Sequence, residues 1–253
     1  MKYPILSHEE AVKICYDLPY IYKFTNGKKK LIIFGAGHIA DPRHIQYKKF
    51  RDLFNKLKPD AVFVESWSNE KNWSDFKSEN DIIKVGGEST WLVYCAQKNK
   101  IPAFSWDLPY DKEIKFLLGK YPKELIFAKY ILRNVPYLDK DRLETQLQSR
   151  INQFRNASNW KRFDYSKDNL NKIHNKLFKK EIDFSNHEFY LIAPYPFKND
   201  SILNKISRDA SIERDKHGVK TILGAFKKYD KVIAIMGATH AVMQEPAYKT
   251  YFN

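Results

Sequence analysis

The chain has 253 residues, 43% of them hydrophobic, which is enough to bury a full core, and no run of 18 apolar residues that would predict a transmembrane helix. Its two cysteines, Cys15 and Cys95, lie far apart, which excludes a disulfide framework and a thiolate zinc site. The net charge is +14, but no basic run exceeds three residues and no helix-turn-helix, RNP motif or zinc finger is present, so a lysine-rich solvated surface explains the charge better than a nucleic-acid partner.

The N-terminal part of the chain alternates between helix and strand patterns. Pro19 ends the first helix and Pro59 ends the second, because proline cannot continue a helix that precedes it. The helix between the first two strands makes a βαβ crossover, which requires a parallel pair of strands. The elements expected here are helices at 8–18, 41–57 and 91–97, and strands at 30–34, 61–64 and 101–106.

Residues 111–180 contain no strand pattern and many charged positions, which favours a helical insertion or lid over the sheet. Four helices are expected in this region, at 111–119, 122–134, 140–154 and 167–180. The rest of the chain predicts a strand at 189–193, a helix at 201–228, a strand at 231–236 and a helix after His240. The predicted fold is one α/β domain over residues 1–253, with a mostly parallel or mixed central sheet and helices on both faces.

A Gly-x-x-His pattern follows two of the buried strand patterns. Gly35 and His38 follow the first strand, and Gly237 and His240 follow the last one. With 9 Gly and 7 His in 253 residues, composition alone predicts fewer than one such spacing. Ligands of open α/β sheets bind beyond the carboxyl ends of the strands, so His38 and His240 are expected to meet in one site.

Carboxylates follow the other strands. Glu65 directly follows the second strand, Asp107 follows the third, and Glu88 lies at a Gly-Gly turn on a helix N-terminus, where the helix dipole favours it. Imidazole and carboxylate groups together suit two chemistries, and the sequence leaves both open. His38, Glu65 and His240 can hold Zn²⁺ or Mn²⁺ with an open position for water, or they can act without a metal as general base and general acid.

Glycines and an arginine complete the candidate site. Gly35, Gly37 and Gly237 lie beside the histidines, where glycine permits positive φ and a close approach to a substrate. Each loop also leads to a helix N-terminus whose N–H groups can hold an oxyanion. Arg208 and Arg214 are six residues apart on the long helix, so only one of them is expected to point into the site, and spacing alone does not say which.

Four short motifs occur in a fixed order along the chain. They are Phe34-Gly35-Ala36-Gly37-His38, Val62-Phe63-Val64-Glu65, Glu213-Arg214-Asp215 and Met236-Gly237-Ala238-Thr239-His240. In this order they resemble the TraB/TIKI/GumN family, which belongs to a superfamily with the erythromycin esterases and the ChaN-like haem-binding proteins. The resemblance implies an α/β fold in two halves that converge on one cleft. It also implies His38, Glu65, Arg214 and His240 as catalytic residues, with Glu88 as a weaker addition.

This resemblance supplies the lead hypothesis for the function. TIKI-like members are metal-dependent proteases, and erythromycin esterases hydrolyse a lactone with a histidine and a glutamate. We therefore expect a hydrolase that cleaves a peptide or ester bond of a small-molecule or peptide substrate, with Mn or Zn as the cofactor if a metal takes part. Arg214 would either orient Glu65 or bind a substrate carboxylate or phosphate. Asp107, Glu88 and the three glycines are expected on the substrate-binding side.

Two other classes of function remain as alternatives. The first is a non-catalytic protein that binds haem or another small ligand, with a Tyr or His at the rim ligating the iron. The second is nucleic-acid binding through the basic surface, which would weaken steeply with salt. The first ten residues lack the apolar core of a signal peptide, so a cytoplasmic location is expected.

Overall fold

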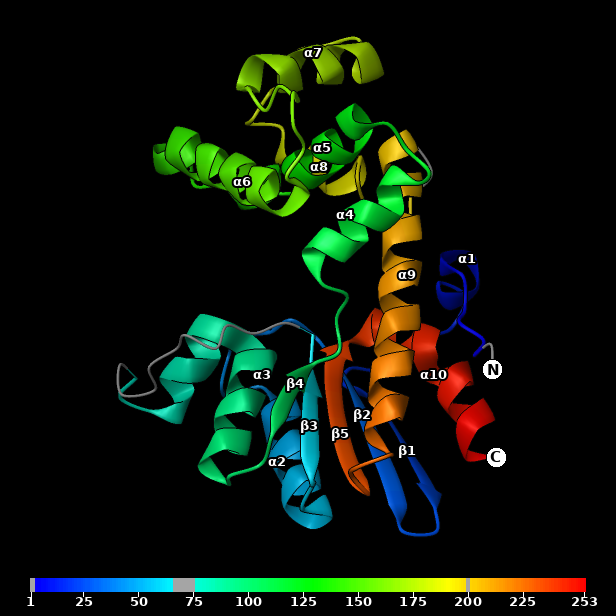
Figure 1. Ribbon diagram of the computed structural model, residues 1–253. Coiled ribbons are helices and arrows are strands. Elements are labelled where there is room, and N and C mark those ends of the chain that lie inside the picture. The colour runs from blue at the N-terminus through cyan, green and yellow to red at the C-terminus, as the bar shows by residue number, and fades with distance from the viewer. Residues whose placement is uncertain (1–2, 66–75, 199–200) are drawn as a thin grey trace. The chain divides into compact units, whose positions relative to one another are not determined.

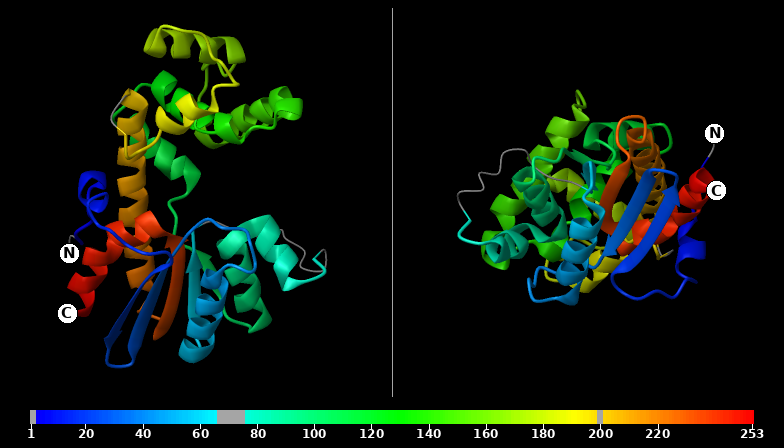
Figure 2. Two further views of the ribbon diagram at one scale, coloured as in Figure 1. Left: turned by 180° about the vertical axis from the view of Figure 1, so that it is seen from behind. Right: turned by 90° about the horizontal axis from the view of Figure 1, so that it is seen from below.

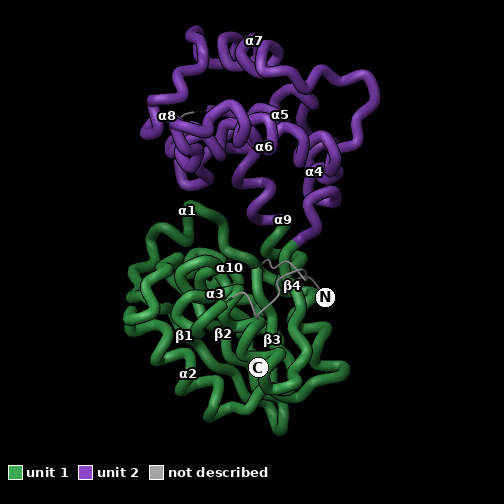
Figure 3. The backbone as a smooth tube through the Cα atoms, turned by 90° about the vertical axis from the view of Figure 1, so that its left-hand side faces the viewer, with its two compact units in different colours: residues 1–107, 214–253 green, residues 108–213 purple. Residues whose placement is uncertain are grey.

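The computed structural model describes residues 3–65, 76–198 and 201–253 of the chain (Figure 1). The chain forms two compact units (Figure 3). Unit 1 consists of Met1–Asp107 and Arg214–Asn253, and unit 2 is Leu108–Glu213. The predicted helical insertion at 111–180 falls within unit 2, and its role as a lid stays a prediction.

Unit 1 contains a mixed five-stranded sheet with the order β1-β2-β5-β3-β4 (Figure 1). The strands are β1 (Tyr20–Asn26), β2 (Lys29–Ala36), β3 (Ala61–Val64), β4 (Ala103–Ser105) and β5 (Lys231–Gly237). β1 is antiparallel to β2, and all other pairs are parallel. The predicted α/β class with a mostly parallel or mixed sheet is therefore confirmed.

The strand pairing differs from the predicted βαβ unit in one respect. β2 and β3 have the same direction but do not pair, because β5 lies between them and pairs with Lys30 through Lys231 and with Val62 through Ile233. Residues 232–237 of β5 are all buried, as expected for a central strand covered on both faces. The carboxyl ends of the four parallel strands therefore lie at one edge of the sheet.

The edge strand β1 was not predicted from the sequence. It forms a hairpin with β2, in which Asn26 pairs with Lys29 across the two-residue turn Gly27-Lys28. Gly27 has φ of +60°, a conformation that glycine adopts without a steric penalty and that two-residue hairpin turns require. The alternating pattern of aromatic and polar residues before this turn is typical of a half-buried strand.

Helices cover both faces of the sheet, as predicted (Figures 1 and 2). Alternation along β2 sends Leu31 and Ile33 to one face and Ile32 and Phe34 to the other. The first pair packs with the C-terminal part of α9 (Ile202–Ala225) and with α10 (Ala238–Phe252). The second pair packs with α2 (Ile45–Leu57) and α3 (Glu79–Lys98). None of the described helices has the length and hydropathy needed to cross a membrane.

Several helix boundaries of unit 1 differ from the predicted ones. α1 spans only His8–Ala11, where Ser7 and Glu10 form a capping box. α3 begins twelve residues earlier than expected, because Ser78 caps it by accepting a hydrogen bond from the backbone of Asp81. α10 begins at Ala238, so His240 belongs to its first turn rather than to the loop before it.

Unit 2 is helical and has its own aromatic core, which includes Phe127, Phe154 and Tyr190. Its elements are α4 (Tyr110–Leu118), α5 (Lys123–Leu132), η2 (Val135–Tyr137), η3 (Lys140–Arg142), α6 (Leu143–Ser158), α7 (Lys167–Phe178), α8 (His187–Ile192) and the N-terminal part of α9. The four helices expected in the insertion are confirmed with small shifts. The strand expected at 189–193 is wrong, because Asn186 caps a helix there and Tyr190 is buried against His174.

Candidate functional site

The residues predicted for the site lie in unit 1, at the edge where the parallel strands end. His38 follows β2, Glu65 follows β3 and Asp107 follows β4, while His240 comes from the first turn of α10 after β5. Gly237 lies between the two histidines. A Cβ atom at Gly237 would lie 3.1 Å from His38 Nε2 and 3.8 Å from His240 Cδ2. The structure therefore brings the two histidines to one place, although 201 residues separate them along the chain.

His38 is held by a carboxylate from the helix layer on one face. Its Nδ1 lies 2.8 Å from Glu88 Oε1. Glu88 starts the second half of α3, directly after a kink at Gly87, whose φ of +60° favours glycine. The hydrogen bond to Glu88 raises the pKa of His38, and partial burial opposes this effect. The side chain of His38 is 71% exposed, so water and solutes reach its ring.

His240 is held in the same way by a carboxylate from the opposite face. Its Nδ1 lies 2.7 Å from Asp215 Oδ1, on α9, and the ring of Trp106 lies against it with centroids 5.5 Å apart. The side chain of Asp215 is 0% exposed and that of His240 only 15%. Burial by itself would lower the pKa of His240, but the carboxylates of Asp215 and Glu65 outweigh burial and raise it. Asp215 was not among the site residues predicted from the sequence.

Arg214 holds two carboxylates at the ends of neighbouring strands. Its Nη2 donates to Glu65 Oε1 at 2.8 Å and to Asp107 Oδ2 at 2.7 Å, and its Nε donates to Asp107 Oδ1 at 2.7 Å. The pair with Asp107 is bidentate, the geometry in which arginine binds carboxylates most strongly. Of the two roles considered for Arg214, orienting Glu65 is the one with a direct contact. Arg208 belongs to unit 2 and donates instead to the carbonyl of Lys198.

Glu65 is a partly buried carboxylate with cations around it. Burial by itself would raise its pKa, but His240, Arg214 and His38 lower it to about 2. Its second oxygen lies 3.4 Å from the backbone nitrogen of Gly237. Glu65 is therefore ionised at neutral pH, and its main effect is a fixed negative charge beside both imidazoles.

The three glycines of the histidine motifs have structural reasons to be glycine. The expected positive φ at these positions is wrong, because only Gly27 and Gly87 adopt it among the glycines described. At Gly35 a Cβ would lie 2.8 Å from the Cβ of Ala241, so this glycine packs against α10. Gly37 lies beside Leu18 and Ile39, and Gly237 lies beside His38, as given above. The close approaches are therefore made to the chain itself.

The expected metal ligands are arranged differently from a three-residue metal site. Among the described residues no group of three or more His, Cys, Asp and Glu side chains is placed to hold a metal ion. The carboxylate on Nδ1 of each histidine is typical of metal-ligating histidines and leaves Nε2 as the free atom. Glu65, the third expected ligand, bonds to Arg214 instead. The residues described thus do not fit the His38, Glu65 and His240 set, and Mn or Zn stays a prediction.

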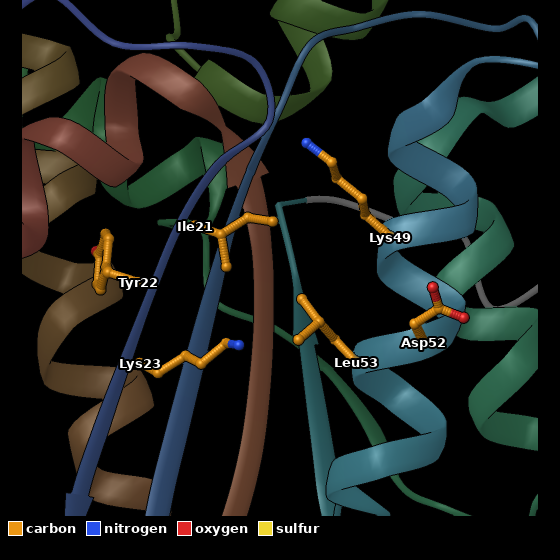
Figure 4. Close-up of a pocket in the computed structure, with 6 residues that line it drawn as sticks. All are labelled: Ile21, Tyr22, Lys23, Lys49, Asp52 and Leu53. Atoms are coloured by element: carbon orange, nitrogen blue, oxygen red, sulfur yellow. The ribbon is translucent and has the colours of Figure 1, made fainter.

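An open groove of about 500 Å³ lies elsewhere in unit 1, between β1 and α2 (Figure 4). It is lined by Ile21, Tyr22, Lys23, Lys49, Asp52 and Leu53. Its one candidate iron ligand, Tyr22, is buried and donates its hydroxyl to the carbonyl of Ala241. This groove therefore offers haem no axial ligand and contains none of the site residues.

Comparison with known proteins gives no further identification. No family model matches this chain, and no curated protein matches it. The resemblance to the TraB/TIKI/GumN family therefore stays a prediction.

Proposed function

We propose that the chain is a hydrolase of ester or peptide bonds, in which two histidines act as general base and general acid. One observation carries this proposal. Each histidine is held through Nδ1 by its own carboxylate, and both rings lie beside Gly237. A carboxylate on Nδ1 fixes the ring and its tautomer, so that Nε2 is left to accept or donate a proton.

The two histidines differ in exposure, and this difference suggests their roles. His38 is largely exposed and meets solvent, so its neutral form is the group that removes a proton from the attacking water. His240 is mostly buried beside Asp215 and Glu65, which favour its protonated form. His240 is therefore the group that protonates the leaving alcohol or amine.

Glu65 and Arg214 provide electrostatic support for these proton transfers. An ionised Glu65 stabilises the imidazolium that forms on His38 when water is deprotonated. Arg214, itself held by Asp107, holds Glu65 in place. A carboxylate with a pKa of about 2 is a weak base, which is why we assign the base role to a histidine.

The proposal is tested by assaying the purified chain on panels of esters and short peptides, with divalent-metal content measured on the same preparation. Replacing His38 or His240 by alanine should each lower kcat by about 10²–10⁴-fold, the usual contribution of a general acid or base. Lys28→Ala, in the exposed turn between β1 and β2, is the control and should leave kcat unchanged. Activity that survives His38→Ala combined with Glu65→Ala would contradict the proposal, as would a folded chain that cleaves no member of either panel.

Haem or small-ligand binding without catalysis is the second candidate. The observation in its favour is that His38 has an exposed ring whose Nδ1 is fixed by a carboxylate, as in many proximal iron ligands. A Soret band that saturates near one equivalent of haem and disappears in His38→Ala would support it, and a flat titration removes it.

A further inference from the structure

A buried hydrogen-bonded chain continues behind His240, away from the reacting face. Gln244 and Tyr248 follow His240 on α10 at spacings of four residues, so all three lie on one face of the helix. Gln244 Nε2 donates to Asp215 Oδ1 at 2.7 Å, and the Tyr248 hydroxyl donates to Gln244 Oε1 at 2.7 Å. Asp215, Gln244 and Tyr248 are fully buried.

The buried carboxylate of Asp215 has few hydrogen-bond donors around it. Its Oδ1 receives both His240 Nδ1 and Gln244 Nε2, while its buried Oδ2 accepts no hydrogen bond from the described residues. Gln244 is therefore the one neutral donor to this carboxylate in the described part of the chain. Both donors share Oδ1, so the hydrogen bond from Gln244 competes with His240 for the charge of Asp215.

The surroundings leave the Gln244 amide little freedom. A Cβ at Gly218, one turn after Asp215 on α9, would lie 2.6 Å from the ring of Trp106 and 3.4 Å from Gln244 Nε2. Glycine at this position thus lets Trp106 and Gln244 pack directly on α9. The Tyr248 hydroxyl needs an acceptor, which makes Oε1 its partner and turns Nε2 toward Asp215.

We propose that Gln244, oriented by Tyr248, is a positioning residue that fixes Asp215 and thereby the proton and ring orientation of His240. This inference rests on the proposed function for its catalytic meaning, but the hydrogen-bonded chain can be tested without a substrate. The titratable and charged groups that face His240 or Asp215 are Arg214 on α9, Glu65 after β3, His38 across Gly237, Tyr22 on β1 and Tyr248 on α10.

The test is a titration of His240 by NMR in the full-length chain. Gln244→Met keeps the size of the side chain and removes the donor, so the charge of Asp215 acts on His240 alone. We expect the pKa of His240 to rise by about half a unit or more, while that of His38 stays unchanged as the internal control. Tyr248→Phe should also raise the pKa of His240, but by less, because the Gln244 amide stays in place and is only less firmly oriented.

The kinetic counterpart is the pH profile of kcat. In Gln244→Met the alkaline limb, which reports loss of the proton from His240, should move to higher pH, and the acid limb should stay in place. An unchanged pKa of His240 in folded Gln244→Met overturns the inference. If Gln244→Met does not fold, an unchanged pKa of His240 in Tyr248→Phe overturns the inference instead. A shifted pKa in a chain that hydrolyses nothing would support the inference and contradict only the proposed hydrolase.

Discussion

The two histidine–carboxylate pairs use the same groups in different surroundings. His38 stands in a loop after β2, largely exposed, with Glu88 supplied by α3. His240 belongs to the first turn of α10, mostly buried, with Asp215 supplied by α9. Their Nδ1–oxygen distances, 2.8 and 2.7 Å, are nearly equal. The two pairs therefore have the same hydrogen-bond geometry but differ in the access of solvent to the histidine ring.

The two motifs are one residue out of register in the sheet, and their histidines bond to carboxylates from opposite layers. Ala36 pairs with Gly237, so Gly35 and Gly237 are out of step by one residue across β2 and β5. A shift of one residue in a strand sends a side chain to the other face of the sheet. Both histidines lie beyond the strands, where His38 bonds to Glu88 of α3 and His240 bonds to Asp215 of α9. A repeated sequence motif thus gave two different environments.

The largest expected effect separates the two carboxylate partners. Asp215→Asn should lower kcat by about 10³-fold, because a buried amide can donate to Nδ1 and stabilise the wrong tautomer of His240. Glu88→Gln should cost only about 10-fold, since the exposed ring of His38 can exchange its partner for water. The measurement is kcat at saturating substrate for both variants, and their thermal unfolding midpoints show whether each variant is folded. Equal losses would show that burial does not distinguish the pairs.

The charge that both pairs share predicts a pH-dependent stability. Glu65 has a folded pKa of about 2 against 4.5 for the free group, so its contribution is present above pH 4.5 and is lost as the pH falls toward 2. That difference corresponds to about 3 kcal/mol at neutral pH. Urea unfolding of the natural chain and of Glu65→Gln should therefore differ most near pH 7 and converge near pH 2. A constant difference would mean that the neighbouring cations do not stabilise the ionised Glu65.

The paired glycines provide a third test of the comparison. Gly35→Ala should lower the free energy of unfolding by about 1–3 kcal/mol, because its Cβ would overlap Ala241 on α10. Gly237→Ala should instead displace the His38 ring, whose Nε2 lies 3.1 Å from the new Cβ, and lower kcat more than stability. Chemical denaturation and kcat measured on both variants would separate the two effects. The reverse pattern would contradict the arrangement.

The smallest expected effect is the response to salt. Raising the ionic strength should raise the pKa of exposed His38 by a few tenths of a unit and change that of buried His240 less, because salt screens the net charge of +14 at solvent-exposed groups. NMR titrations at about 0.05 and 0.5 M NaCl measure both in one sample. A larger shift at His240 would indicate that solvent reaches the Asp215 side.

The sequence was most informative where the apolar runs were continuous. Such runs predict the strands β2, β3 and β5. They do not predict the order of these strands in the sheet, because the packing of the whole unit decides which distant strands pair. β1 could have been predicted from Gly27-Lys28, because glycine at the first position of a two-residue loop is typical of a type II′ hairpin turn. The short apolar run at 189–193 fits strand and helix equally well, and the contact between Tyr190 and His174 decides for helix.

The candidate site was predicted in part for a similar reason. His38, Glu65 and His240 follow strands, and strand ends are readable from sequence. Asp215 was missed because it lies inside the long helix expected at 201–228 and does not follow a strand. A signal was present, since Asp215 shares a helix face with buried Val219 and Ile222, at spacings of four and seven residues. A carboxylate on the buried face of a helix needs a partner, and His240 is that partner.

The central place of β5 has a consequence for how the chain folds. β5 precedes only α10 in the order of elements, yet it is the strand that joins β2 to β3. Pairing between segments so distant along the chain is a slow step, because the loop that joins them must close first. During synthesis, β2 and β3 remain without their shared neighbour until β5 has been made. The two histidines therefore acquire their common surroundings only after β5 has paired with both strands.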